Sequence, residues 1–103
     1  MAVYSVSRRA RADLLGIASY TRMRWGKAQA RLYVEQLRFC AQRLADNPRL
    51  GRSCDGIRPG LMRVEQASHV VFFRRQPGSA VLVCRILHQR MNAATQPIDD
   101  DEP

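Results

Sequence analysis

The sequence predicts an α+β fold with an N-terminal strand, an antiparallel helical hairpin and a three-stranded antiparallel meander packed on the helices. Two observations lead to this prediction. Apolar side chains recur every three or four positions through residues 8–47, which is the spacing of one helix face. Residues 61–88 then contain short apolar runs separated by turn-forming residues, the pattern of consecutive strands. A chain of 103 residues is long enough to bury one core.

The N-terminal half begins with a short strand at residues 3–6, which ends at Ser7, a residue type that caps helix N-termini. The first helix is expected over residues 8–25 and the second over residues 27–47, with Gly26 as the break between them. Because one short turn joins two amphipathic helices, we expect them to pair antiparallel and to place both apolar stripes on the sheet.

The C-terminal half begins with a connector, Pro48–Pro59, that is rich in turn-forming residues. Strands are expected at about residues 61–67, 69–75 and 80–88, and Gln76–Ser79 has proline and glycine at the central positions of a type II turn. The last two strands are apolar at successive positions. We therefore expect both to lie centrally and to be covered on two faces.

The chain is strongly basic, with 17 cationic and nine acidic residues. Four of the acids form the terminal run 99–102, so residues 1–98, with 17 cationic and five acidic side chains, carry a net charge of +12. This balance indicates a negatively charged partner, either a nucleic acid or an acidic protein; a solvated basic surface is the alternative. Arg8, Arg9 and Arg11 occupy the first turns of a helix, where the macrodipole disfavours cations. An acidic partner would explain them, unless they simply face water.

Composition argues against several classes of site. Cys40, Cys54 and Cys84 are widely separated and only His69 and His88 could complement them, which disfavours a disulfide framework and a metal site. No glycine-rich loop precedes a helix, and the carboxylates before residue 99 are scattered, so no cofactor is expected. With no signal-like segment and no apolar run of about 18 residues, we expect a cytoplasmic protein that does not contact membrane.

Several segments in register resemble the ParE branch of the RelE/ParE toxin superfamily over roughly Val3 to Asn92. They are Arg-Leu-Ala-Asp-Asn-Pro-Arg-Leu-Gly-Arg, Ile-Arg-Pro-Gly-Leu-Met-Arg, His-Val-Val-Phe-Phe-Arg and Ile-Leu-His-Gln-Arg-Met. The resemblance implies a toxin of a type II toxin-antitoxin module, encoded on plasmids or chromosomes. It also implies that the toxin inhibits DNA gyrase by binding it and that a ParD-like antitoxin neutralises it in a hetero-oligomer.

RelE-type members of the superfamily instead cleave messenger RNA on the ribosome, which requires proton transfer and neutralisation of phosphorane charge. RelE-like nucleases resemble one another in carrying basic residues at positions that correspond here to Leu61, Arg63, Val70 and Arg90, with a tyrosine near the C-terminus. Only Arg63 and Arg90 match, and no tyrosine follows. His88 could transfer a proton, but a lone histidine at a strand end is more often a structural residue. We therefore expect no catalytic residues; a ribosome-dependent endoribonuclease and a basic nucleic-acid-binding module remain the alternatives.

Two binding surfaces are expected within a single toxin domain at residues 1–94, followed by an acidic, disordered tail at residues 95–103. The residues expected to contact the target are Arg63, Arg74, Arg85, His88 and Arg90. The residues expected to contact the antitoxin are Arg8, Arg9, Arg11, Tyr20, Met23 and Trp25. Trp25 could instead close the hairpin core, and Arg85 could be a buried, paired structural residue. Because most aromatic residues are assigned to the core, no direct sequence-specific nucleic-acid binding is expected.

Overall fold

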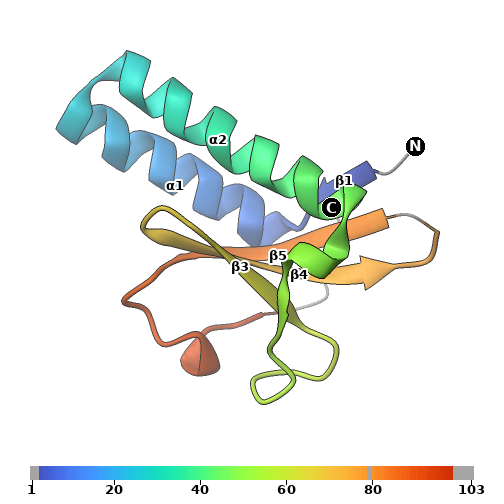
Figure 1. Ribbon diagram of the computed structural model, residues 1–103. Helices are drawn as coiled ribbons and strands as arrows, with labels where there is room; N and C mark the ends of the chain where they lie inside the picture. Colours follow the sequence, from blue (N-terminus) through green and yellow to red (C-terminus); the bar gives the residue numbers. More distant parts are fainter. Residues whose placement is uncertain (1–2, 79, 99–103) are drawn as a thin grey trace.

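The computed structural model describes residues 3–78 and 80–98 and confirms the α+β class (Figure 1). The helical elements lie close to their expected positions: α1 is Arg8–Trp25 and α2 is Lys27–Asp46, followed by the short 3-10 helix η1, Pro48–Leu50. The strands are β1 (Val3–Val6), β2 (Arg52–Ser53), β3 (Met62–Gln66), β4 (His69–Gln76) and β5 (Ala80–His88), and a second 3-10 turn, η2, spans Ala93–Thr95. Gly78 has φ 75°, the sign that a type II turn requires there.

The expected meander of β3, β4 and β5 is the centre of a five-stranded sheet with the order β1-β5-β4-β3-β2. β1 adds to one edge in parallel with β5, and the helical hairpin supplies the crossover that a parallel pair needs. β2 adds to the other edge through the pairs Arg52 with Arg63 and Ser53 with Met62. The connector after α2 therefore contributes a short strand in addition to the three of the expected meander, because two of its residues pair with β3.

The helices cover one face of the sheet, here called the helix face (Figure 1). The core on this side includes Leu37 and Leu44 of α2 with Val71, Phe73 and Val81 of the central strands. Alternate residues of β4 and β5 point to the opposite face of the sheet, here called the loop face. A second core forms on this face beneath loop segments. β4 and β5 are thus covered on both faces, as expected.

The loop-face core extends beyond the expected end of the folded region. Ile98 is 4% exposed and packs with Leu61, Val70 and Phe72. The backbone carbonyl of Pro97 accepts a hydrogen bond of 2.7 Å from Arg85 Nη1. The ordered chain therefore reaches Ile98, past the boundary expected at residue 94. The expected disorder of the acidic run falls on residues 99–103, which lie outside the described residues.

Ser7 confirms its predicted role at the start of α1. Its Oγ accepts a 3.0 Å hydrogen bond from the Ala10 N–H and donates one of 2.8 Å to the carbonyl of Cys84. Its backbone N–H donates to the carbonyl of Val83 at 2.9 Å, and the residue is 0% exposed. One residue therefore caps the helix and fixes the start of α1 to the edge of β5.

A β-bulge interrupts the pairing of β4 with β5, where Phe72 lies opposite Arg85 but Phe73 lies opposite Val83. Next to this bulge, the Asp13 carboxylate of α1 accepts bonds of 2.8 and 3.0 Å from Arg85 Nε and Nη2, and a third of 2.9 Å from the Ile86 N–H. The Arg85 and Asp13 side chains are only 11% and 15% exposed. This charge-assisted cluster fastens α1 to β5 beyond the point where β1 ends.

Asp13→Ala is expected to lower the free energy of unfolding by about 3 kcal/mol, because it leaves the Arg85 guanidinium and a strand N–H without their shared acceptor. Urea denaturation measures the change. Glu65→Ala is the control, since Glu65 forms an exposed ion pair with Arg52. The control should cost less than about 1 kcal/mol. Equal losses in the two variants would show that the Asp13 cluster does not stabilise the fold.

Candidate functional site

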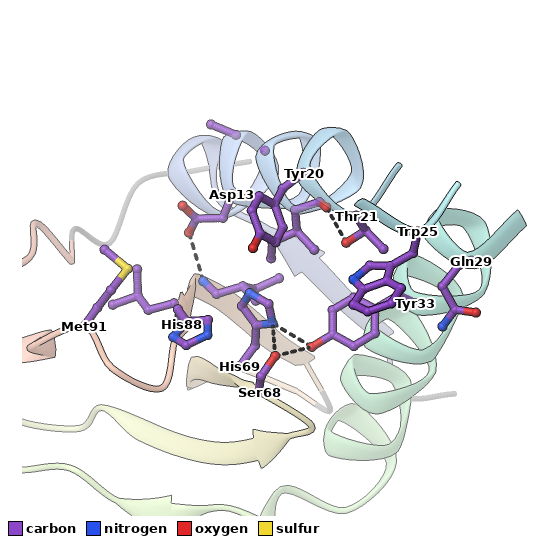
Figure 2. Close-up of a pocket in the computed structure, with 15 residues that line it drawn as sticks. Asp13, Tyr20, Thr21, Trp25, Gln29, Tyr33, Ser68, His69, His88 and Met91 are labelled. Carbon is purple, nitrogen blue, oxygen red and sulfur yellow. Dashed lines mark hydrogen bonds between the residues drawn. The ribbon is translucent and has the colours of Figure 1, made fainter. Parts of the chain in front are cut away.

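An open groove of about 900 Å³ lies on the helix face, between the C-terminal half of α1, the start of α2 and the ends of β4 and β5 (Figure 2). Its walls are largely apolar and aromatic, and polar groups gather where the strands end. The residues that define it include Gly16, Ile17, Tyr20, Trp25, Tyr33, His69, His88 and Met91. A concave apolar surface with a few convergent polar groups is the usual form of a binding site.

The aromatic wall comes from the hairpin end of α1. Tyr20 and Trp25 line the groove and are 62% and 69% exposed, so the alternative that Trp25 closes the hairpin core is wrong. The Arg24 guanidinium carbon lies 5.7 Å from the centroid of the Tyr20 ring, a cation–π arrangement that orients the tyrosine. Met23 is 84% exposed but is not part of the groove lining. Gly26, with φ 95°, ends α1 directly after Trp25 and lets the chain reverse into α2.

The polar floor of the groove is built from Tyr33 of α2, Ser68 between β3 and β4, and the paired strand residues His69 and His88 (Figure 2). Tyr33 Oη lies 2.6 Å from His69 Nδ1, and the two histidine rings meet edge to face with centroids 5.5 Å apart. His88 Nδ1 accepts a 3.1 Å hydrogen bond from the Arg90 N–H. Burial lowers the pKa of His69, and the neighbouring His88 lowers it further, while Asp13 acts in the opposite direction.

The residues expected to contact the target do not form one surface. Arg63 lies on the loop face, opposite Phe72, with its Nε 3.8 Å from a Glu65 oxygen. Arg74 donates a 2.6 Å hydrogen bond to the carbonyl of Pro59. Arg85 is held in the Asp13 cluster, which favours the structural alternative for this residue.

The other two expected target residues lie elsewhere. His88 lies in the groove on the helix face, and Arg90 is exposed just past the end of β5. The expectation of one target surface must therefore be corrected: residues that follow one another along strands point alternately to opposite faces.

The two positions that carry basic residues in RelE-like nucleases are interior here. Leu61 is 0% exposed and Val70 is 9% exposed, and both belong to the loop-face core. Val70 also lies directly opposite Glu65 in the β3–β4 pairing, so the nearest charged strand residue is acidic. A phosphorane would meet neither a cation nor a proton donor at these positions.

The basic residues expected to bind the antitoxin lie at the other end of α1 from the aromatic ones. Arg8, Arg9 and Arg11 are exposed in its first turns. Arg11 lines a second, smaller groove of about 440 Å³, which runs over Leu14 toward Arg38 of α2. Arg11 and Trp25 are fourteen positions apart on α1, a rise of about 21 Å. A partner that contacts both groups must therefore lie along the helix.

Sequence reasoning missed three features of the surface. Tyr33 and Ser68 were not considered as site residues; only the fold brings Tyr33 to His69, whereas Ser68 precedes it directly in the sequence. Phe39 is 67% exposed on α2, beside the exposed Leu32, although most aromatic residues were expected in the core. Its spacing was an available signal, since it falls between the stripe residues Leu37 and Cys40 and hence off their face.

The remaining ionisable groups show no second chemical site. The three cysteines are buried and form no disulfide, and burial raises the pKa of the Cys40 and Cys54 thiols, which disfavours the reactive thiolate. Within residues 3–78 and 80–98, histidine, cysteine and carboxylate side chains form no cluster suited to a metal ion. Over the same residues, neither helix combines the length and apolar character needed to span a membrane.

Comparison with known proteins matches residues 4–93 to the family described as ParE toxin of type II toxin-antitoxin system, parDE. Toxin ParE1 of Mycobacterium tuberculosis is 43% identical over 86% of this chain and 91% of its own length. Toxin ParE1 of Caulobacter vibrioides is 42% identical over 90% and 95%, and Toxin ParE of Escherichia coli is 36% identical over 96% and 96%. A chain of the solved structure "Chromosomal ParDE TA system from P. aeruginosa" has the same fold, with a TM-score of 0.71 and 22% identity over 85% of this chain and 96% of that one.

His69 is expected to make the free protein less stable in mild acid. Because its pKa is lowered in the folded state from the ordinary value of 6.5, the unfolded chain binds this proton more readily. The contribution of His69 to stability is therefore complete above that value and is lost as the pH falls toward the folded pKa. When the pH is lowered from 7.5 to 5.5, the urea midpoint should fall further in the wild-type protein than in His69→Gln. An equal fall in both would contradict this assignment.

Proposed function

The chain belongs to the ParE toxin family of type II toxin-antitoxin systems, and from this premise we propose that it inhibits DNA gyrase by binding it, without a catalytic step of its own. We propose further that it acts in the cytoplasm and that a ParD-like antitoxin neutralises it in a hetero-oligomer. The family match supports the toxin-antitoxin part of this proposal, and the geometry bears on the absence of catalysis and on the antitoxin site.

The burial of Leu61 and Val70 is the observation that carries the non-catalytic part of the proposal. Message cleavage needs groups that deprotonate a 2′-hydroxyl and neutralise the charge of the transition state. At these two positions the chain has core side chains, and Arg63 is partly neutralised by Glu65. An interior apolar position does not accept a charge without a large desolvation cost, so these residues support binding and not cleavage.

Arg90 is the strongest candidate for contact with the target. It is exposed beyond β5, and the described residues give its side chain no hydrogen bond or ion pair. Its backbone N–H is fixed by His88 Nδ1, so the residue has a defined position although its side chain projects into solvent. Arginine in this setting can anchor an interface with a carboxylate surface.

The groove on the helix face is the proposed antitoxin site. Tyr20 and Trp25 give it exposed aromatic surface, and such residues are common anchors of protein interfaces. Arg8, Arg9 and Arg11 lie along the same helix and would attract an acidic partner. An antitoxin segment that follows α1 would use both groups.

Controlled expression in a bacterial host tests the toxic activity, with a DNA-damage reporter and mapping of message ends read in parallel. The proposal predicts damage signalling without message cleavage, and purified protein should inhibit gyrase supercoiling. Codon-specific cuts on ribosomes would instead select the RelE-type nuclease and refute the proposal.

Arg90→Ala should reduce toxicity at least about tenfold, because it removes an exposed interface cation, while the urea midpoint stays unchanged. Arg75→Ala is the matched control, since Arg75 is also exposed on the last part of β4. Loss of soluble protein in Arg90→Ala would assign the residue a structural role. Full toxicity with normal folding would remove it from the target surface.

Replacing Arg8, Arg9 and Arg11 together with Ala should weaken antitoxin binding about tenfold at low salt and much less at high salt, since screened surface charges act mainly over a Debye length. Calorimetric titration at two ionic strengths gives the dissociation constants. The matched control replaces the exposed Arg31, Arg49 and Arg75 with Ala, which changes the net charge equally. If both triple variants weaken binding to the same extent, the effect is general charge and not a defined contact.

A further inference from the structure

The two histidines at the floor of the groove present hydrogen-bond donors that the fold leaves unused. A backbone N–H can only donate, so the bond from Arg90 N–H requires His88 Nδ1 to be an acceptor. In the neutral ring the proton must then be on Nε2. None of the described residues accepts a hydrogen bond from that atom.

In His69, as in His88, the Nδ1 atom contacts a neighbouring group, which here is Tyr33. Tyr33 Oη lies 2.6 Å from His69 Nδ1, and a phenol is a far stronger acid than a neutral imidazole N–H. With Tyr33 as the donor to Nδ1, the proton of His69 is also on Nε2. The part of the chain that the structure describes offers this second donor no acceptor either.

The pairing of β4 with β5 brings these donors together. His69 and His88 are opposite one another in the register, and their rings touch edge to face at a centroid distance of 5.5 Å. Figure 2 shows both rings on the groove side of the strands, below α1. The other charged or titratable groups that face them are Asp13 and Tyr20 of α1 and Tyr33 of α2. The Asp13 carboxylate is already engaged by Arg85 and the Ile86 N–H.

The chemistry of the walls disfavours a phosphate and fits an acceptor group with no more than one negative charge. The described residues that line the groove include no arginine or lysine, although the chain has 17 of these residues. A phosphate with two charges would lack counter-charge there, whereas one carboxylate matches two neutral N–H donors. Apolar walls such as Ile17 and Trp25 suit the flanking side chains of a peptide, and low polarity strengthens hydrogen bonds at the floor.

We propose that His69 and His88 together bind one aspartate or glutamate side chain of the antitoxin at the floor of the groove, with Tyr33 as the residue that positions His69. This inference rests on the proposed antitoxin site and adds its chemistry. Protonation of His69 on Nδ1, with Tyr33 Oη as its acceptor, turns the neutral Nε2 donor into a charged one. Antitoxin binding should therefore tighten as the pH falls, whereas the free protein becomes less stable over the same range.

The test measures the dissociation constant of the full-length chain with its ParD-like antitoxin between pH 8.0 and pH 6.0. The wild-type value should fall about three- to tenfold over this range. His69→Gln retains an N–H near the Nε2 position but does not titrate, so it should bind within about threefold of wild type at pH 8.0 and lose most of the pH dependence. His88→Leu should bind about tenfold more weakly at pH 8.0. Thermal melting of each variant shows whether it folds.

Amide replacement of each antitoxin acid identifies the partner side chain and does not depend on how the toxin variants fold. One Asp→Asn or Glu→Gln change should flatten the pH dependence of the wild-type toxin and should add nothing further to His69→Gln. Tyr33→Phe should weaken the pH dependence, because His69 loses the bond that fixes its tautomer. A wild-type constant that does not change with pH, or the absence of any coupled acid, would overturn the proposal.

Two further variants separate this inference from the function on which it rests. Trp25→Ala should weaken antitoxin binding about tenfold if the groove is the antitoxin site. If Trp25→Ala binds normally, the placement of the antitoxin fails; if it binds weakly while the histidine variants bind like wild type, only the carboxylate site fails. A truncated chain that ends at Ile98 tests whether the toxin's own acidic run occupies the groove in place of the antitoxin. Tighter antitoxin binding by that chain would assign the site to residues 99–102 and overturn the proposed occupant.

Discussion

The fold depends on how the long edge of β5 is satisfied beyond the point where β1 ends. β1 pairs with β5 only through Ala80–Val83, yet β5 continues to His88, and unpaired strand groups at that edge would be costly. Ser7 donates hydrogen bonds to the carbonyls of Val83 and Cys84. The Asp13 carboxylate accepts hydrogen bonds from the Ile86 N–H and the Arg85 guanidinium. These contacts fix the first half of α1 against the sheet, in both position and rotation.

The groove is a consequence of this attachment. Because the contacts to β5 come from the first turns of α1, the later turns pass over the ends of the strands, and Tyr20 and Trp25 remain exposed there. The contacts that attach α1 to β5 come from its first turns, and its exposed aromatic surface comes from its later turns. The arginines divide in the same manner: Arg85 completes a structural cluster, while Arg90, five residues later, projects into solvent.

The same architecture can support either cleavage or binding, so function is decided by individual positions. The side chains at Leu61 and Val70 illustrate the difference between cleavage and binding. Both belong to the loop-face core with Ile98, and a basic residue at either position would place a charge in that apolar core. The packing of the loop face therefore opposes a nuclease centre, while the helix face keeps an accessible groove with two oriented imidazoles.

The sequence by itself determined the elements that depend on local chemistry. The helix bounds, the Ser7 cap, the turn at Gly78 and the central position of β4 and β5 follow from side-chain spacing and from residue types that act over a few positions. Only the tertiary structure decided the roles of Arg85, Trp25 and His69. Asp13 and Arg85 are 72 positions apart, and Tyr33 and His69 are 36 apart. The sequence does not show whether a charged or aromatic side chain contacts such a distant partner. That contact determines whether the side chain is structural or free to bind.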